Sequence, residues 1–449
     1  MFKSLLIANR GEIALRIART AESMGIEPYF VYESYDKALP HAKHKNSHEI
    51  ISYTDPVEIV DFASSIGIEA IHPGYGFIAE NPKFVKLTNQ AGIEFVGPSH
   101  QAMLKLGNKQ LMLKSAKIAD IPHIPGVFLD IKNIDAAIRE AKNIGYPVIV
   151  KGKESGGGRQ IKLIQSDDEL VNVITKIKRT EQVQEIYIAK FLTNVKHIEV
   201  QLLGDKNSDM VALGTRDCSV QRRFQKLIEE APAATIHPVF QKKIENTAIE
   251  IAHLVDYTNA CTVEFLFDEN GNHFFMEVNP RLQVEHCVTE EIYGIDIVKH
   301  QLLIASGESL DQSLKTIKRN GHSIQCRINA EDPIQDFMPL SKMKLKSYAP
   351  LNQIKGKVRF ETFLQENLDI PTQYDSLIAK VIVNGKDRED AIMKTLIQLN
   401  NLKIEGFPCT LNFFKVLLNE HMFHSGNHKT NYINLFMQDI KEELKTKYT

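Results

Sequence analysis

The sequence predicts an α/β protein that begins with a doubly wound parallel sheet. Apolar stretches at 4–8 and 27–32 predict buried strands, and apolar residues at helical spacing predict helices over 12–24 and 57–66. Each helix pattern is closed by a glycine, Gly25 or Gly67. Strands that alternate with helices form parallel β-α-β units, so residues 1–107 are predicted to form the first domain.

Two later changes of pattern divide the rest of the chain. Residues 108–319 contain a helix pattern at 134–145, a strand at 146–150, a glycine-rich run and a strand at 160–164. From residue 320, strand patterns at 322–328, 342–348 and 377–383 are followed by helix patterns at 388–400 and 411–418. This predicts a C-terminal α+β domain over 320–449. No low-complexity linker separates the domains, so we expect them to be packed together.

Composition excludes several classes of protein. The 449 residues are 43% apolar, enough for large cores, and the formal charge of −2 argues against a nucleic-acid binder. The five cysteines never form CxxC pairs and indicate reduced thiols rather than disulfides or a zinc site. We find neither a secretory signal pattern nor the roughly 20 apolar residues that cross a bilayer. The sequence therefore predicts a cytoplasmic protein without a membrane partner.

The run KGKESGGGRQI, at 151–161, follows a predicted strand. Glycines let backbone N–H groups approach phosphates closely. The run matches neither the P-loop pattern nor the dinucleotide pattern. Three interpretations stay open at this point: a phosphate loop of another kind, a remnant of one, or a flexible turn.

Residues 261–279 predict a β-hairpin with Asn270-Gly271 as its two-residue turn. Glu264 would then face Glu277, and Thr262 would face Asn279. Opposed carboxylates repel each other unless a divalent cation such as Mg²⁺ lies between them. The alternative is a hairpin with exposed glutamates.

Three polar residues alternate after the second strand of this hairpin. Arg281, Gln283 and Glu285 are expected on one face. A guanidinium group can hold a small anion through two hydrogen bonds, and a carboxylate can accept a proton. The pattern predicts a binding site for a small anion.

Six segments together resemble the biotin carboxylase family of the ATP-grasp fold. They are NRGEIA (9–14), HPGYGF (72–77), RDCSVQRRFQK (216–226), EVNPRLQVEH (277–286), CRINAED (326–332) and YDSLIAKV (374–381). The resemblance covers nearly the whole chain. It implies an N-terminal biotin carboxylase domain at 1–107, an ATP-grasp domain at 108–319 with a mobile glycine-rich lid at about 124–192, and a C-terminal biotin carboxylase domain at 320–449.

The resemblance also implies a reaction. Such ligases use ATP, Mg²⁺ or Mn²⁺ and bicarbonate to form carboxyphosphate, and then carboxylate N1 of biotin on a carrier protein. The chain is expected to be the biotin carboxylase subunit of an acyl-CoA carboxylase, with acetyl-CoA carboxylase of fatty acid biosynthesis favoured. Its implied partners are a biotin carboxyl carrier protein, carboxyltransferase subunits and a second copy of itself.

Site residues are carried over from the matching motifs. Glu285 would be the base, Arg281 would hold bicarbonate and steady the biotin enolate, and Lys226 would complete the catalytic set. The bicarbonate pocket would also include Gln283 and the Val284 backbone. The metal ligands would be Glu264, Glu277 and Asn279, and the biotin contacts Tyr75 and Arg327. The ATP site would comprise Lys109, Lys151, Gly157, Gly158, Arg159, Ala189, Lys190, Phe191, Leu192, His197, Gln221, Glu264 and Glu277.

The sequence departs from the family pattern near the nucleotide. Lys153, Glu154, Ser155 and Gln160 replace small residues or glycine in the loop. Ala189 replaces a glutamate, and Phe224 replaces a histidine. If each lost contact is worth about 1 kcal/mol, ATP affinity falls roughly tenfold or more.

These departures support a different hypothesis, a low-activity or non-catalytic regulatory paralogue. A third hypothesis is an ATP-grasp ligase that joins a carboxylate to an amine. The biotin-side residues Tyr75 and Arg327 count against it.

Overall fold

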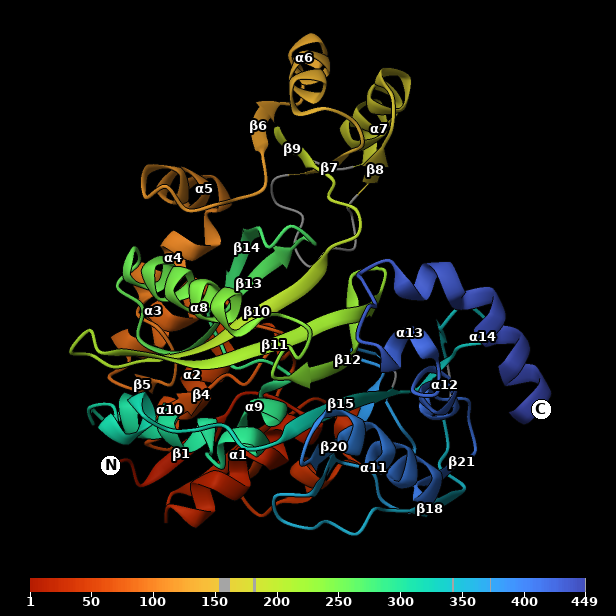
Figure 1. The fold of residues 1–449 in the computed structure, drawn as a ribbon. Coiled ribbons are helices and arrows are strands. Elements are labelled where there is room, and N and C mark those ends of the chain that lie inside the picture. The colour runs from red at the N-terminus through yellow and green to blue at the C-terminus, as the bar shows by residue number, and fades with distance from the viewer. Residues whose placement is uncertain (153–161, 181–182, 341–342, 372, 449) are drawn as a thin grey trace.

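The structure is a computed structural model that describes residues 1–152, 162–180, 183–340, 343–371 and 373–448. It is a mixed α/β fold with a parallel N-terminal sheet, which confirms the predicted fold class (Figure 1). No helix in these ranges is long and apolar enough to cross a membrane.

The N-terminal domain is built on a parallel sheet with the strand order β3-β2-β1-β4-β5. Central strand β1 is apolar and buried, as a sheet covered on both faces requires. The strands are β1 (Ser4–Ile7), β2 (Glu27–Tyr32), β3 (Ser47–Glu49), β4 (Ala70–His72) and β5 (Glu94–Phe95). The helices are α1 (Gly11–Ser23), η1 (Ser34–Asp36), η2 (Pro40–Lys43), α2 (Pro56–Ser65), α3 (Pro82–Gln90) and α4 (His100–Gly107).

An antiparallel sheet of eight strands, ordered β14-β13-β10-β11-β12-β15-β20-β19, runs through the middle of the molecule. It joins the central region to the C-terminal domain through the pairing of β12 with β15. Its strands are β10 (Lys196–Gly204), β11 (Met210–Arg222), β12 (Gln225–Ala231), β13 (Asn259–Phe267), β14 (His273–Asn279), β15 (His322–Asn329), β19 (Val358–Thr362) and β20 (Leu377–Gly385). The helices of this part are α5 (Lys109–Ile118), α8 (Pro238–His253), α9 (His286–Tyr293), α10 (Ile297–Ala305) and η3 (Gln312–Lys315).

A separate four-stranded sheet, ordered β6-β9-β7-β8, projects from the top of the molecule in Figure 1 with α6 and α7. Its own core includes Val148, Ile174 and Ile188. The predicted loop residues Gly157, Gly158 and Arg159 lie outside the described residues. The elements are β6 (Gly126–Asp130), α6 (Ile134–Ile144), β7 (Val148–Gly152), β8 (Lys162–Ile164), α7 (Asp167–Thr180) and β9 (Glu185–Lys190).

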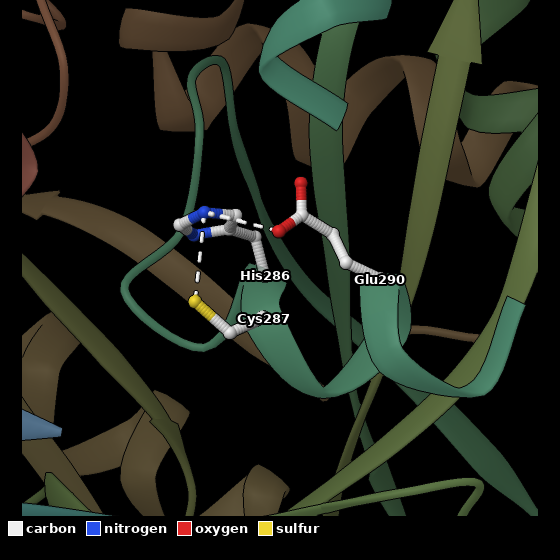
Figure 2. A group of neighbouring side chains, drawn as sticks. All are labelled: His286, Cys287 and Glu290. Atoms are coloured by element: carbon white, nitrogen blue, oxygen red, sulfur yellow. Dashed lines mark hydrogen bonds and ion pairs between the residues drawn. The ribbon is translucent and has the colours of Figure 1, made fainter. Parts of the chain in front are cut away.

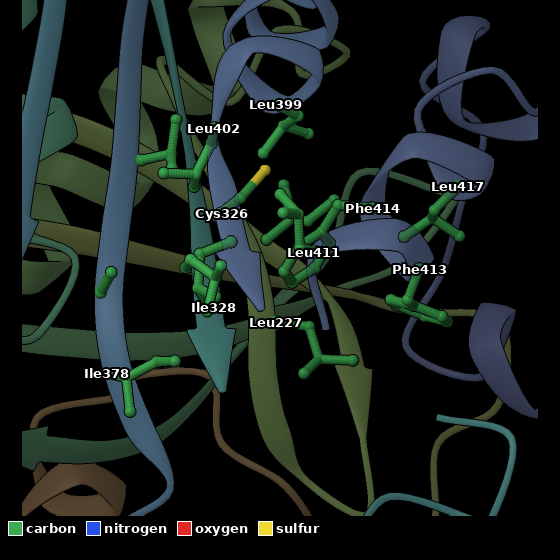
Figure 3. Close-up of a cluster of buried hydrophobic side chains, with 14 of the residues drawn as sticks. Leu227, Cys326, Ile328, Ile378, Leu399, Leu402, Leu411, Phe413, Phe414 and Leu417 are labelled. Carbon is green, nitrogen blue, oxygen red and sulfur yellow. The ribbon is translucent and has the colours of Figure 1, made fainter. Parts of the chain in front are cut away.

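The C-terminal domain packs its helices on the end of the long sheet. Leu227 of β12 and Cys326 of β15 meet Phe414 of α12 in one buried cluster, so strands and helices share a core (Figure 3). The predicted strand at 342–348 is wrong in extent, because the described strand there is only β18 (Ser347–Ala349). The remaining elements are β16 (Glu331–Asp332), β17 (Met338–Pro339), α11 (Arg388–Asn401), β21 (Lys403–Glu405), α12 (Leu411–Leu417), α13 (His421–His424) and α14 (Tyr432–Tyr448).

Candidate active site

The hairpin of β13 and β14 brings two glutamates face to face. Glu264 pairs with Glu277 and Thr262 with Asn279, as predicted. Side chains alternate along a strand, so Glu277 and Asn279 lie on one face of β14. The amide Nδ2 of Asn279 donates to Glu264 Oε1 at 3.0 Å. One end of the hairpin therefore gathers three oxygen-bearing side chains.

The turn of this hairpin is longer than predicted. The Asp268 carboxylate accepts the backbone N–H groups of Asn270 (3.0 Å) and Asn272 (2.8 Å), and the Asp268 N–H donates to the Asn272 carbonyl (3.0 Å). The pairing then shifts by one residue between Glu264 and Phe265. This bulge offsets the longer turn. The two-residue turn was therefore wrong, although the pairing deduced from it at Glu264 is right.

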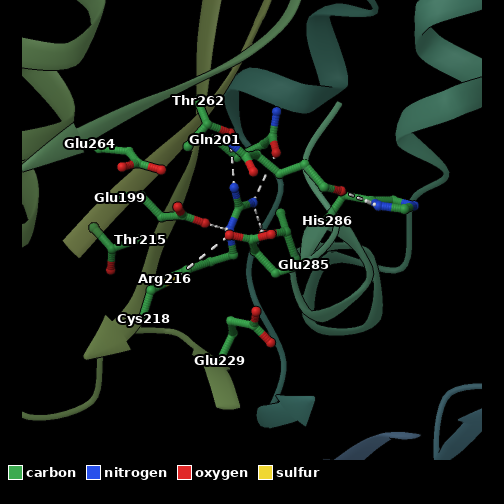
Figure 4. Close-up of polar contacts among 12 residues, drawn as sticks. Glu199, Gln201, Thr215, Arg216, Cys218, Glu229, Thr262, Glu264, Glu285 and His286 are labelled. Atoms are coloured by element: carbon green, nitrogen blue, oxygen red, sulfur yellow. Dashed lines mark hydrogen bonds and ion pairs between the residues drawn. The ribbon is translucent and has the colours of Figure 1, made fainter. Parts of the chain in front are cut away.

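Lys226 joins three carboxylates at the centre of the site. It lies in β12, in register with Gln221 of β11. The acceptors of its Nζ are Glu199 Oε2 at 2.6 Å, Glu264 Oε1 at 2.8 Å and Glu285 Oε1 at 2.7 Å. All three glutamates are buried, and Figure 4 shows them around Arg216. Coulomb attraction is strong where water is excluded, so this one ammonium group holds the carboxylates together.

The charges of this cluster support one another. Burial lowers the pKa of Lys226, but the surrounding carboxylates raise it well above its usual value. Burial raises the pKa of Glu285, but Lys226 and Arg327 hold it well below its usual value. Glu264 follows the same pattern. Burial raises its pKa, but Lys226 and His197 lower it more, so the pKa lies below its usual value. Lys226, Glu264 and Glu285 are therefore charged at neutral pH.

A buried arginine supports the cluster from behind. Arg216 of β11 is 0% exposed, and its Nε donates to Glu199 (Figure 4). Its other acceptors are Gln201 Oε1 at 2.8 Å, Thr262 Oγ1 at 2.9 Å and Thr289 Oγ1 at 3.0 Å. A guanidinium group whose donors are satisfied in this way fixes the Glu199 carboxylate beneath Lys226.

Arg327 connects the predicted biotin side to the predicted base. It lies in β15, and its NH2 group donates to Glu285 Oε2 at 3.0 Å while its Nε donates to Glu229. Glu229 of β12 also accepts from Gln325 Nε2 at 3.0 Å. Burial outweighs Arg327 and raises the pKa of Glu229 to about 7. Arg327 thus shares the carboxylate of Glu285 with Lys226.

The other predicted biotin residue, Tyr75, contacts the same region from the N-terminal domain. Its hydroxyl donates to Glu12 of α1. Lys380 of β20 is 0% exposed and donates to Glu12 Oε1 at 3.0 Å and to the Val284 carbonyl at 3.1 Å. A single buried ammonium group therefore ties the N-terminal domain and the C-terminal strand to the predicted bicarbonate pocket.

Residues 280–285 are irregular, with a bend at Arg281 and a turn at 284–285, and do not form the strand-like face that we predicted. Pro280 cannot donate to a ladder, and α9 begins directly after Glu285. The guanidinium of Arg281 contacts Glu80 Oε1 at 2.7 Å and Asn279 Oδ1 at 3.2 Å. Gln283 is buried, and its Nε2 finds no acceptor in the described part of the chain. A buried amide donor near ionised Glu285 suits a small oxyanion.

Two predicted phosphate lysines meet between the body and the small projecting sheet. Lys109, at the start of α5, donates to Glu277 Oε2 at 3.0 Å. Lys151 of β7 lies with its Nζ 5.6 Å from the Tyr187 ring centre. Burial, followed by repulsion from Lys109, lowers the pKa of Lys151 to about 8. Two ammonium groups this close indicate a site that attracts a polyanion.

The predicted nucleotide residues divide between two sheets. His197 of β10 has its Nε2 3.0 Å from Glu264 Oε2, so His197 and Gln221 adjoin the Lys226 cluster. Ala189 and Lys190 end β9 in the projecting sheet, and Phe191 and Leu192 follow it directly. The ammonium of Lys190 is used locally, because it donates to the Gly145 carbonyl at 2.7 Å.

Five polar residues of the site were not predicted from the sequence. They are Glu12, Glu199, Arg216, Glu229 and Lys380. A usable signal existed for Glu199 and Lys380, which interrupt otherwise apolar strands in HIEVQLL and LIAKVIV. A charge within a buried strand requires a partner. The sequence does not show which partner, because the contacts join distant parts of the chain.

The described residues also line a cavity of about 510 Å³ between α1, α9 and β19. Its walls include Arg16, Glu290, Arg359 and Glu361, and no residue of the Lys226 cluster. The candidate site is therefore a separate feature, between the long sheet and the projecting one.

Family models match almost all of the chain. They are described as "Biotin carboxylase, N-terminal domain" over 1–103, "Carbamoyl-phosphate synthase L chain, ATP binding domain" over 108–313 and "Biotin carboxylase C-terminal domain" over 325–435. Biotin carboxylase 1 of Bacillus subtilis is 40% identical, over 97% of this chain and 99% of its own length. The chain belongs to the biotin carboxylase family. This confirms the resemblance of the six motifs.

Other members and solved structures agree with the assignment. A pyruvate carboxylase subunit of Methanothermobacter thermautotrophicus is 38% identical, over 99% of this chain and 92% of its own. The biotin carboxylase domain dimer of the Hydrogenobacter thermophilus 2-oxoglutarate carboxylase, solved with MgADP, ADP and bicarbonate, superposes with a TM-score of 0.93 at 38% identity. That match covers 98% of this chain and 99% of that one. Biotin carboxylases are ATP-dependent ligases that form a carbon–nitrogen bond, the predicted enzyme class.

Proposed function

We propose that this protein uses ATP and bicarbonate to carboxylate biotin on a separate carrier protein. The observation that carries the proposal is the ionised Glu285, held at 2.7 Å by Lys226 and at 3.0 Å by Arg327. The predicted base, the predicted bicarbonate lysine and the predicted biotin arginine thus meet at one carboxylate. An amine ligase would have no need of this connection between Glu285 and Arg327.

Bicarbonate would bind beside this carboxylate. Gln283 Nε2 is a free buried donor among the described residues, and Arg281 and the Val284 N–H flank it in the turn. Arg281 would exchange its exposed partner Glu80 for the anion. Glu285 would take the bicarbonate proton, and the oxyanion so formed would attack the γ-phosphate of ATP to give carboxyphosphate, with ADP as the leaving group. Carboxyphosphate would then break into CO₂ and phosphate, and the phosphate would take the N1 proton of biotin. The biotin enolate so formed, stabilised by the guanidinium groups, would bond through N1 to CO₂.

The residues of the hairpin suit Mg²⁺. Hard oxygen donors are what this ion prefers, and Glu264, Glu277 and Asn279 supply them. Ammonium groups already contact both carboxylates, Lys226 at Glu264 and Lys109 at Glu277. Mg²⁺ would therefore share these carboxylates with the two ammonium groups. When bound, Mg²⁺ would neutralise charge on the ATP phosphates.

We propose acetyl-CoA as the final acceptor, a carrier protein and carboxyltransferase subunits as partners, and a homodimer. A dimer is recorded for the 2-oxoglutarate carboxylase domain, and relatives of similar identity belong to pyruvate and methylcrotonoyl-CoA carboxylases. Supplying this protein with each carboxyltransferase in turn, and measuring acetyl-CoA against pyruvate and 2-oxoglutarate, tests the acceptor. Its five free cysteines, four of them buried, are consistent with the cytoplasm.

The first test is ATP hydrolysis by the purified protein with Mg²⁺ and free biotin. We expect a rate of ATP hydrolysis that requires both bicarbonate and biotin. Bicarbonate supplies the proton that Glu285 removes, and biotin is the acceptor for the CO₂ of carboxyphosphate. Transfer of labelled bicarbonate to a biotinylated carrier completes the test. A rate independent of bicarbonate, with no label transferred, contradicts the proposal.

A regulatory, weakly active paralogue is the second candidate. The hairpin tip between β11 and β12 presents Phe224 with 53% of its surface exposed, and Ala189 is 1% exposed. Both are apolar at positions where the family has polar groups. This candidate expects little MgATP binding by calorimetry, whereas the first expects measurable binding.

ATP binding is expected to be coupled to proton uptake. The pKa of Lys151 is about 8, below the usual 10.5, so at pH 8.5 the amine of Lys151 is neutral in most of the protein molecules. Phosphate beside the amine favours the charged form and raises that pKa. ATP binding should therefore cause Lys151 to take up a proton at pH 8.5. At pH 6.5 the amine is already protonated, so Lys151 takes up none. Calorimetry in two buffers with different ionisation heats measures the uptake. Lys151→Met should remove it, and equal heats in both buffers with the unmodified protein would refute this prediction.

A further inference from the structure

A buried histidine beside the proposed bicarbonate pocket has no role in the proposed reaction. His286 is the first residue of α9, directly follows Glu285 and is 0% exposed (Figures 2 and 4). Its Nδ1 lies 2.7 Å from the Gln283 carbonyl oxygen, and its backbone N–H donates to the same oxygen at 3.2 Å. A carbonyl oxygen only accepts hydrogen bonds, so Nδ1 carries the hydrogen and Nε2 a lone pair.

The surroundings of His286 keep it in this neutral form. Burial, together with nearby Lys380, lowers its pKa well below the usual value. Its Nε2 faces Cys287 Sγ at 3.6 Å and Glu290 Oε2 at 3.8 Å (Figure 2). Burial raises the pKa of the Cys287 thiol to about 11, so the thiol keeps its proton and can donate it weakly to Nε2. The Nδ1–H is thus always available to Gln283.

The Gln283 carbonyl and the Val284 N–H belong to the same peptide. That peptide is planar and trans, so the two groups point in opposite directions. Two donors from His286 hold the oxygen on one side and thereby set the direction of the N–H on the other. The next peptide is held too, because the Val284 carbonyl accepts from Lys380 Nζ at 3.1 Å. Both peptides that lead to Glu285 are fixed.

We infer that His286 is a positioning residue that aims the Val284 N–H at bicarbonate. The inference rests on the proposed function, in which this N–H donates to the anion. A donor already aimed at the anion needs no reorganisation when it binds. Without the imidazole, the peptide keeps only the weaker backbone donor and can rotate. Bicarbonate binding should then weaken, while the nucleotide lysines, Lys109 and Lys151, are unaffected.

Two substitutions separate the Nδ1 donor from the rest of the imidazole. His286→Asn keeps an N–H close to the position of Nδ1, whereas His286→Gln places its amide near Nε2 and leaves the Gln283 carbonyl with one donor. We expect His286→Gln to raise KM for bicarbonate roughly tenfold, the effect of one lost hydrogen bond, with KM for ATP within about twofold. His286→Asn should restore KM for bicarbonate to within about threefold of the unmodified protein.

His41→Gln is the matched control. His41 is also a fully buried histidine, but it lies in the N-terminal domain, 3.3 Å from the Tyr53 hydroxyl. The His41→Gln substitution should lower the melting temperature of the protein without changing KM for bicarbonate. A shift in KM for bicarbonate in this control would show that any buried histidine has the effect, and would overturn the inference.

The outcomes distinguish this inference from the proposed function. If the unmodified protein shows no bicarbonate-dependent ATP hydrolysis, the proposed function fails and His286 has no anion donor to position. If it does, an unchanged KM for bicarbonate in His286→Gln, or equal rises in both variants, overturns the inference alone. Should His286→Gln fail to fold, His286→Asn decides by itself: a KM for bicarbonate raised tenfold in a folded protein is the contradicting result.

Discussion

Lys226→Met is expected to abolish bicarbonate-dependent turnover, by a factor of about 10³ or more, and to destabilise the fold. The methionine has a similar length but no charge. Glu199, Glu264 and Glu285 would remain buried without the ammonium group that now lies 2.6–2.8 Å from each. Breaking a buried ion pair from one side costs about 3–5 kcal/mol.

The pH dependence of this loss has a definite sign. In Lys226→Met, burial would raise the pKa values of Glu264 and Glu285 above their unfolded values, because both lose the cation that lowers them most. Their cost to stability is then full above the raised values and disappears as pH falls below the unfolded ones. Urea unfolding at pH 8 and pH 5 should show the deficit shrinking at the lower pH.

A surface lysine provides the control. Lys206 is 53% exposed and pairs with Glu94, so Lys206→Met should change the unfolding free energy by less than about 1 kcal/mol at either pH. If Lys226→Met keeps more than a tenth of the turnover, the ammonium group is not at the centre of the chemistry.

Glu285→Gln is expected to reduce biotin carboxylation about 10²–10⁴-fold with little effect on nucleotide affinity. Glutamine has nearly the same shape as glutamate but cannot take a proton from bicarbonate, and general-base catalysis is worth about that factor. Lys226 would keep its ion pairs with Glu199 and Glu264, and Arg327 would keep its ion pair with Glu229. Stability should therefore fall less than in Lys226→Met.

Steady-state carboxylation and calorimetric MgATP binding, made on the same preparation, measure the two expected effects. Glu33→Gln is the matched control, because Glu33 is a buried glutamate of the N-terminal domain that accepts from the Tyr53 N–H at 2.7 Å. It should keep full turnover. Carboxylation by Glu285→Gln within tenfold of the unmodified protein would exclude Glu285 as the base.

Local patterns in the sequence predict local structure well here. The alternation of side chains in β13 and β14 placed Glu264 opposite Glu277, and that pairing is present. The turn was wrong because Asp268 accepts two backbone N–H groups and stabilises a longer loop. A bulge farther along the strands can offset a longer turn. The turn residues by themselves therefore do not determine the register of the two strands.

Contacts between distant segments could not be predicted from such patterns. Lys380 meets Glu12 and the Val284 carbonyl, and these residues belong to three different parts of the chain. A lysine in an apolar strand shows that a partner must exist, but the fold selects it. Resemblance to a family supplied what local physics did not: the roles assigned to Tyr75 and Arg327 depend on it entirely.

The pairing of β12 with β15 has a consequence for how the protein can be divided. Sequence patterns place a domain boundary near residue 320, yet the ladder of hydrogen bonds continues across it, from Ile228 opposite Cys326 to Ala231 opposite Ser323. A fragment that stopped at the boundary would leave β12 as an unpaired edge, open to pairing with other chains. It would also lose Arg327, the neighbour of Glu285. The central and C-terminal parts of this enzyme are thus one unit of sheet, and gene fusions or truncations would have to respect the sheet rather than the boundary.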